Sequence, residues 1–130
     1  MPRYAISEHD WPHRHWDLFL EDGDALRTWR LLARPDHEAT IPAVFTFPHR
    51  RIYLDYSGAI SQNRGQITRW DTGEFCWVED SPERVLIRLV GEQWQGTLEL
   101  RHLAGEDWQA IASPWLTDSV PQSPQAEPGE

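Results

Sequence analysis

The chain has 130 residues and a formal net charge of −9, and all 12 of its basic residues are arginine. This length favours a single domain. The lack of lysine excludes Schiff-base and lysyl-adenylate chemistry. The acidic net charge disfavours a protein that coats nucleic acid. No apolar run reaches the length of a membrane span, and the single cysteine, Cys76, is typical of a reducing compartment, so we expect a cytoplasmic protein without a membrane segment.

Alternating apolar and polar residues, the pattern of half-buried strands, run through almost the whole chain. Turn-forming residues separate these segments, among them DTGE at 71–74, and no segment shows the period of a helix. Many short strands at such spacing predict an all-β fold, a single antiparallel β-barrel-like domain with little helix. The expected strands are 15–21, 25–32, 43–47, 51–56, 65–71, 74–78, 84–90, 96–103 and 107–112.

Residues 1–116 contain all of these strands and make up the expected domain. Residues 117–130 are rich in proline, serine, glutamine and glutamate, so we expect a disordered tail. The 8 tryptophans are expected to fill the barrel interior because each one buries a large apolar area. The alternation within the strands predicts that the buried residues include Leu18, Leu20, Val44, Leu86, Leu98 and Leu100.

The stretch SEHDWPHRHWDLFLEDG at 7–23 gathers histidines and aspartates at the start of a strand. Alternate residues of a strand share a face, so His15, Asp17 and Phe19 point the same way. His9, on the preceding proline-containing segment, is expected to fold back and add a second imidazole. Two imidazoles and one carboxylate suit a divalent transition metal with positions left for water and substrate, whereas the alternative is a solvated strand with incidental histidines.

A second cluster lies at 47–58, FPHRRIYLDYSG, where His49 and Tyr53 are four residues apart and Tyr53 and Asp55 share a predicted strand face. A histidine and a phenol beside a metal can supply a proton donor and an oxyanion ligand, although a lone histidine is more often a surface residue. Arginines flank the histidines of both clusters and are interpreted either as a phosphate-binding patch or as solvated charges; they are Arg14, Arg50 and Arg51.

Further motifs accompany the two clusters. In chain order they are Asp22-Gly23, Thr28-Trp29, Tyr53-Leu54-Asp55, RWDTG at 69–73 and GEQWQGTLELRH at 91–102. With His9, His15-Trp16-Asp17 and His49, this order resembles the 3′-phosphoesterase domain found at one end of bacterial DNA ligase D. The resemblance runs from about residue 4 to residue 112.

The resemblance implies a manganese-dependent enzyme that trims 3′ ends in DNA repair. It implies that His9, His15 and Asp17 hold Mn²⁺ or another divalent metal, and that His49 and Tyr53 contact the scissile phosphate. The implied partners are a nucleic-acid 3′ end or a small phosphoester, and a repair protein. We expect the chain itself to be a monomer.

Two departures from the family pattern bear on activity. Phe19 stands where the family has an arginine two residues after the metal-binding aspartate, and the loop at 61–65 is shortened. We therefore expect weakened or altered phosphoesterase activity. One alternative is a catalytically inactive metal-binding or interaction module of the same fold. A second is an iron oxygenase, because His15-x-Asp17 with a distant histidine has the form of a facial triad.

Overall fold

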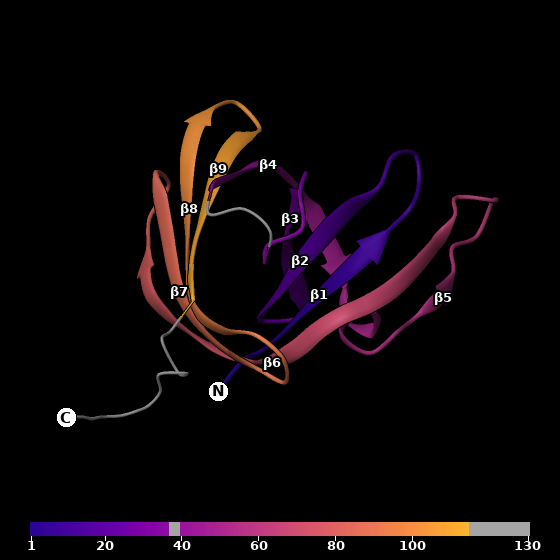
Figure 1. The fold of residues 1–130 in the computed structure, drawn as a ribbon, viewed down its shortest axis with the longest axis horizontal. Coiled ribbons are helices and arrows are strands. Elements are labelled where there is room, and N and C mark those ends of the chain that lie inside the picture. The colour runs from indigo at the N-terminus through magenta and orange to yellow at the C-terminus, as the bar shows by residue number, and fades with distance from the viewer. Residues whose placement is uncertain (37–39, 115–130) are drawn as a thin grey trace.

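The computed structural model describes residues 1–36 and 40–114, and within them the chain is almost entirely β-structure (Figure 1). This confirms the predicted all-β class; the expected tail at 117–130 lies outside the described residues. The elements are β1 (Arg3–His9), β2 (His15–Asp22), β3 (Ala25–Leu31), β4 (Thr40–Arg50), the 3₁₀ helix η1 (Arg51–Leu54), β5 (Gly58–Ala59), β6 (Gln66–Asp80), β7 (Arg84–Gly91), β8 (Gln95–Ala104) and β9 (Asp107–Pro114).

The strands close into an antiparallel barrel, as predicted. Their order is β1-β2-β3-β4-β9-β8-β7-β6-β5, and an additional pairing of β1 with β6 joins the two sides of the sheet. The short strand β5 pairs with β6 outside this ring. In Figure 1, the long strand β6 crosses the bottom of the view from the β1 side of the barrel to the β7 side.

Two hydrophobic clusters fill the molecule, one inside the barrel and one on its outer side. The inner cluster includes Leu18, Leu20, Leu98 and Leu100, which confirms those four predictions. The outer cluster is Ala5, Phe19, Leu26, Leu54 and Ile67, with Tyr53, Tyr56 and Ile60 packed against it. Both faces of β2 are therefore covered, and every residue from His15 to Leu20 is buried.

Two of the predicted core residues, Val44 and Leu86, are only partly buried, so their prediction was wrong. In β7 the inward side chains are those of Val85, Ile87 and Leu89. The segment VLIRLV is apolar at both inward and outward positions, so its alternation has two possible phases. Burial of the opposite phase puts Leu86 on the outer face.

The predicted turn at 71–74 does not exist, because β6 continues through it as a single strand. Gly73 lies opposite Gly91 on β7. A Cβ atom on Gly73 would lie 2.2 Å from the Val90 carbonyl oxygen, so no larger residue fits there. The glycine therefore permits close approach of two strands, where the sequence pattern indicated a turn.

The predicted strand at 51–56 is also wrong, since η1 occupies most of this segment. The Ile52 carbonyl accepts hydrogen bonds from the amides of Asp55 and Tyr56, both at 3.1 Å. This turn lays the segment over β1 and β2, where Leu54 is buried in the outer cluster. Tyr53 and Asp55 consequently do not share a strand face.

The strand β1 was absent from the predicted elements, and it closes the barrel against β6. Within this seam the Tyr4 hydroxyl donates a 2.7 Å hydrogen bond to Asp71 Oδ2. Burial and this hydrogen bond both raise the pKa of the Tyr4 phenol, so it remains a donor. The Gln93 amide donates to Asp71 Oδ1 at 3.0 Å, which ties the β7–β8 turn to the same carboxylate.

Among the described residues, no helix has the length and apolar character needed to cross a membrane.

Candidate metal centre and its pocket

The three predicted metal ligands lie together at the loop end of the β1–β2 hairpin. His9 ends β1 and is paired in register with His15, which begins β2. Asp17 follows two residues later on the same face. His15 Nε2 is 3.3 Å from Asp17 Oδ1, and His9 Nδ1 is 3.8 Å from Asp17 Oδ2. One ligand atom from each residue lies within 4.8 Å of the others, so the three form a candidate metal-binding group.

Hydrogen bonds to backbone carbonyls fix the outer nitrogen of each imidazole. His9 Nε2 donates to the Arg64 carbonyl at 2.9 Å, and His15 Nδ1 donates to the His13 carbonyl at 2.8 Å. The inner nitrogens, His9 Nδ1 and His15 Nε2, are thereby left with lone pairs directed toward Asp17. This arrangement is the usual one for metal-bound histidines, whose second nitrogen donates to a carbonyl or carboxylate.

His15 Nε2 is buried and has no hydrogen-bond partner within the described part of the chain. A buried polar atom without a partner is uncommon in a folded protein because it loses the hydrogen bonds of water. A cation at this point would satisfy it. The donor set therefore fits a divalent transition metal.

Asp17 is ionised in this environment although it is only 4 % exposed. Burial alone would raise the pKa of the carboxyl group, but the adjacent His15 and His9 imidazoles outweigh this effect and lower the pKa to about 2. The same interaction with Asp17 raises the pKa of His9 despite burial. A buried carboxylate between two imidazoles supplies the negative charge that a cation needs.

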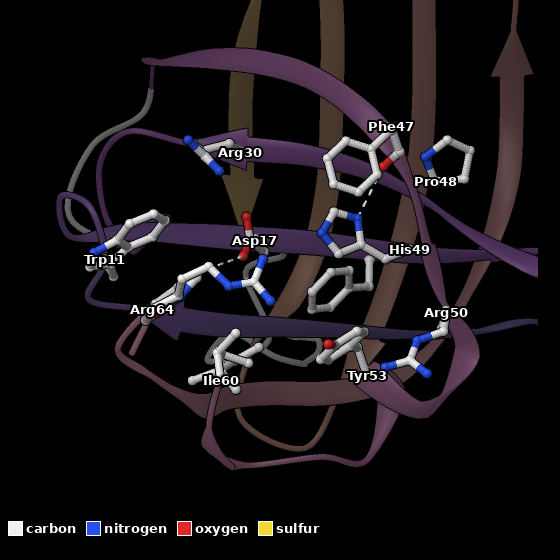
Figure 2. Close-up of a pocket in the computed structure, with 13 residues that line it drawn as sticks. Trp11, Asp17, Arg30, Phe47, Pro48, His49, Arg50, Tyr53, Ile60 and Arg64 are labelled. Carbon is white, nitrogen blue, oxygen red and sulfur yellow. Dashed lines mark hydrogen bonds and ion pairs between the residues drawn. The ribbon is translucent and has the colours of Figure 1, made fainter. Parts of the chain in front are cut away.

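A pocket of about 380 Å³ opens beside this group, and Figure 2 shows the side chains around it. Asp17 and His9 lie in its wall, together with the two predicted catalytic residues, His49 from β4 and Tyr53 from η1. The structure thus brings the two clusters of the sequence to one cavity. This geometry agrees with chemistry at a metal that involves both clusters.

His49 is oriented by its own strand. Its Nδ1 donates to the Phe47 carbonyl at 3.0 Å, which leaves Nε2 as the free ring nitrogen. Burial lowers the pKa of His49, and the nearby Arg30 guanidinium adds to this effect while Asp17 opposes it. The imidazole is therefore predominantly neutral at neutral pH in the free protein.

Residues 7–106 match the model of the DNA Ligase D 3'-phosphoesterase domain. The chain belongs to this family. It is also 27% identical to the "Multifunctional non-homologous end joining protein LigD" of Pseudomonas aeruginosa. The alignment is 124 residues long and covers 88% of the chain. The match covers 14% of that protein, so the chain corresponds to a small part of its length. The resemblance seen in the sequence is confirmed, and the family acts on DNA 3′ ends.

Phe19, which stands where the resemblance implied an arginine, lines the pocket. Its ring is 5.3 Å from that of His49 and 5.9 Å from that of Tyr53, measured between centroids. Only 1 % of Phe19 is exposed, and it is part of the outer cluster. The pocket floor is thus apolar between the two predicted catalytic residues.

The three predicted phosphate-binding arginines are not brought together. Arg50 lines the pocket, with Cζ 5.9 Å from the centroid of the Tyr53 ring. Arg14 is hydrogen-bonded to Glu8, and Arg51 is paired with Glu21 at 2.5 Å. Neither Arg14 nor Arg51 is among the residues that line this pocket.

Two other arginines line the pocket and were not predicted from the sequence. Arg30 on β3 lies directly opposite Asp17 on β2. Arg64 precedes β6, and its guanidinium donates to the Ser61 carbonyl at 2.8 Å and to Ser61 Oγ at 3.1 Å. A signal for Arg30 was present, because counting back from the Asp22-Gly23 turn pairs position 17 with position 30.

The guanidinium groups of Arg30 and Arg50 have no carboxylate partner in residues 1–36 and 40–114, and Arg30 Nε is buried without a hydrogen bond there. Elsewhere on the barrel arginines are neutralised, as Arg27 is by Asp22 and Asp80. Arg50 is exposed, but Arg30 is partly buried, and a partly buried cation without a partner is unfavourable in isolation. The pocket therefore has the electrostatic character of an anion-binding site.

Proposed function

We propose that this protein is a metal-dependent phosphoesterase acting on a 3′ end of nucleic acid, with activity weakened relative to the family pattern. The observation that carries the proposal is the buried, unpartnered Nε2 of His15. It converges with His9 and Asp17 beside a pocket whose arginines lack carboxylate partners among the described residues. A cation site next to an anion site matches a phosphoester bound to a metal. The family supports Mn²⁺ as the preferred ion, while the ligands themselves accept several.

His9, His15 and Asp17 would hold a divalent ion, which would supply polarisation of a phosphate oxygen and a lowered pKa for bound water. We assign Arg30 and Arg50 to the negative charge of the phosphoryl group, in place of the family arginine at position 19. Their positions in the pocket wall support this role. Arg14 and Arg51, with their own carboxylate partners, are not assigned to it.

His49 is proposed to move a proton at Nε2. Its Nδ1 is committed to the Phe47 carbonyl, so Nε2 is the atom that is free to face a ligand. A phosphate dianion in the pocket would raise the pKa of the imidazole by Coulombic attraction. His49 then protonates or stabilises the departing oxygen, and the Tyr53 hydroxyl donates to a phosphate oxygen.

The catalytically inactive module is the second candidate, and the burial of Phe19 favours it. A charge-assisted double hydrogen bond to phosphate is lost at this position, and hydrogen bonds to charged groups are worth about 1.5–3 kcal/mol each. The iron-oxygenase interpretation receives no support from the family assignment. A cytoplasmic location, a monomeric state and a repair-protein partner stay predictions.

Release of phosphate from a DNA primer with a 3′-phosphate, measured with and without Mn²⁺, tests the proposal. We expect slow metal-dependent release that is lost in His15→Ala. His13→Ala is the matched control, because His13 is exposed in the same loop and binds His15 through its backbone carbonyl only. Binding of Mn²⁺ and of the 3′-phosphate end without release would establish the inactive module instead.

A further inference from the structure

A row of aromatic rings leads from the pocket floor to the molecular surface. The Phe47 ring lies parallel to the His49 ring, with centroids 4.8 Å apart and an interplanar angle of 6°. Beyond His49 the row continues to Phe19 and Tyr53. Figure 2 shows Phe47 beside His49 at one side of the pocket.

Phe47 ends this row at the surface of the described structure. The residue is 71 % exposed, an unusual position for a phenylalanine, although its inner face is stacked on His49. Such a ring offers one more stacking position in the row, and that position lies at the rim of the anion-binding pocket. A planar group that stacks on Phe47 while a phosphate lies in the pocket is one that is covalently linked to that phosphate.

The distribution of charge limits how much of a nucleic acid can be bound. The chain has a net charge of −9, yet its pocket gathers Arg30, Arg50 and Arg64 around one buried carboxylate, Asp17. A backbone that extended far from the pocket would meet an acidic protein. Attraction is therefore confined to the last phosphate of a strand, and a second strand would only add repulsion.

We propose that Phe47 is a stacking platform for the terminal base of an unpaired 3′ end. The protein then recognises the last nucleotide and its phosphate, and does not track a duplex. This inference rests on the proposed function, since it takes the phosphate to lie in the pocket. Base–aromatic stacking of this kind is tolerant of base identity, so no strong preference among the four bases follows.

The experiment measures affinity, with Mn²⁺ present, for labelled DNA ends that carry a non-hydrolysable 3′-phosphonate. The ends are an unpaired strand, the same strand with an abasic last nucleotide, and a blunt duplex. Each is tested with the unchanged protein, Phe47→Ala and Phe47→Tyr. The exposure of Phe47 makes both substitutions compatible with folding.

We expect Phe47→Ala to weaken binding of the unpaired end by about five- to a hundredfold, to leave the abasic end unchanged, and Phe47→Tyr to bind as tightly as Phe47. The blunt duplex should bind more weakly than the unpaired end. Equal affinity for base-bearing and abasic ends, or tighter binding of the duplex, overturns the inference and leaves the proposed function standing. Failure of every phosphonate end to bind overturns both.

Discussion

Asp17 and Arg30 lie opposite each other on β2 and β3 and line the same pocket, yet they form no ion pair. Asp17 is instead held by the His9 and His15 imidazoles. The two opposite charges are thus kept available for other partners, a cation at the carboxylate and an anion at the guanidinium. A metal-bound phosphoester would satisfy both charges at once.

The metal site is predicted to stabilise the fold when occupied. Binding to the native state alone adds about 2.7 kcal/mol to the free energy of unfolding at a metal concentration of a hundred times Kd. Mn²⁺ should therefore raise the midpoint of thermal unfolding, and should broaden the NMR signals of His9, His15 and Asp17 before others. Both effects should persist in His13→Ala and vanish in His15→Ala. Broadening centred elsewhere would refute the site.

Removal of the Arg30 side chain is predicted to weaken phosphate binding without lowering the stability of the fold. Arg30→Ala eliminates a half-buried cation without a carboxylate partner, so the free energy of unfolding should stay the same or rise. Binding of inorganic phosphate in the presence of Mn²⁺ should fall by about ten- to a hundredfold, the loss of one charge-assisted hydrogen bond. Calorimetric titration and urea unfolding measure the two quantities.

Arg27→Ala is the matched control for Arg30→Ala. Arg27 lies on the same strand but is paired with Asp22 and Asp80. Its substitution should lower stability slightly and leave phosphate binding unchanged. If Arg27→Ala and Arg30→Ala weaken phosphate binding equally, Arg30 has no special role in the pocket.

Phe19→Arg is predicted to restore part of the phosphoesterase activity. An arginine at this position would regain hydrogen bonds to phosphate, and the rate should rise by about one to two powers of ten per bond. The same change removes an aromatic ring from the outer cluster, so stability should fall. Activity must therefore be compared at equal concentrations of folded protein, with Phe19→Leu as the apolar control. No gain over Phe19→Leu would support the inactive module.

The hydroxyl of Tyr4 is predicted to act on stability alone. Tyr4→Phe leaves the Asp71 carboxylate, only 2 % exposed, without its side-chain donor, at a cost of about 1–3 kcal/mol. Metal and phosphate binding should be unchanged in the folded fraction. Tyr56→Phe removes an exposed hydroxyl bonded to the Ala59 carbonyl and should cost less. Urea unfolding that ranks the two substitutions the other way would contradict this assignment.

Strand alternation was sufficient to predict the barrel and the common face of His15 and Asp17, whereas His9 was expected to fold back from a loop and in fact ends β1. The spacing of His15 and Asp17 puts them on one face of a strand whichever strands lie beside it, so the prediction did not depend on topology. The predicted positions of Phe19, Leu18 and Leu20 held for the same reason. These relationships depend only on the local geometry of β2.

Features that depend on contacts between distant segments were harder to predict from the sequence. Gly73 resembles a turn residue in the sequence, and only the approach of β7 explains why it is a glycine within a strand. The turn at Arg51–Leu54 forms because Leu54 is buried in a cluster on the outer face of the barrel, which no alternation pattern reveals. Arg30 was missed for a related reason, because its proximity to Asp17 depends on hairpin register and not on its own neighbours in the sequence.

The seam between β1 and β6 makes the orientation of His9 depend on a pairing between distant segments of the chain. His9, His15 and Asp17 belong to one hairpin, but the carbonyl that orients His9 is that of Arg64, 55 residues away across the seam. Hairpins form sooner than pairings between distant segments, because closing a long loop is slow. An unclosed barrel therefore has all three ligands near one another but lacks the bond that sets the His9 ring. Tight metal binding then reports that the two ends of the sheet have met, and a bound ion slows their separation.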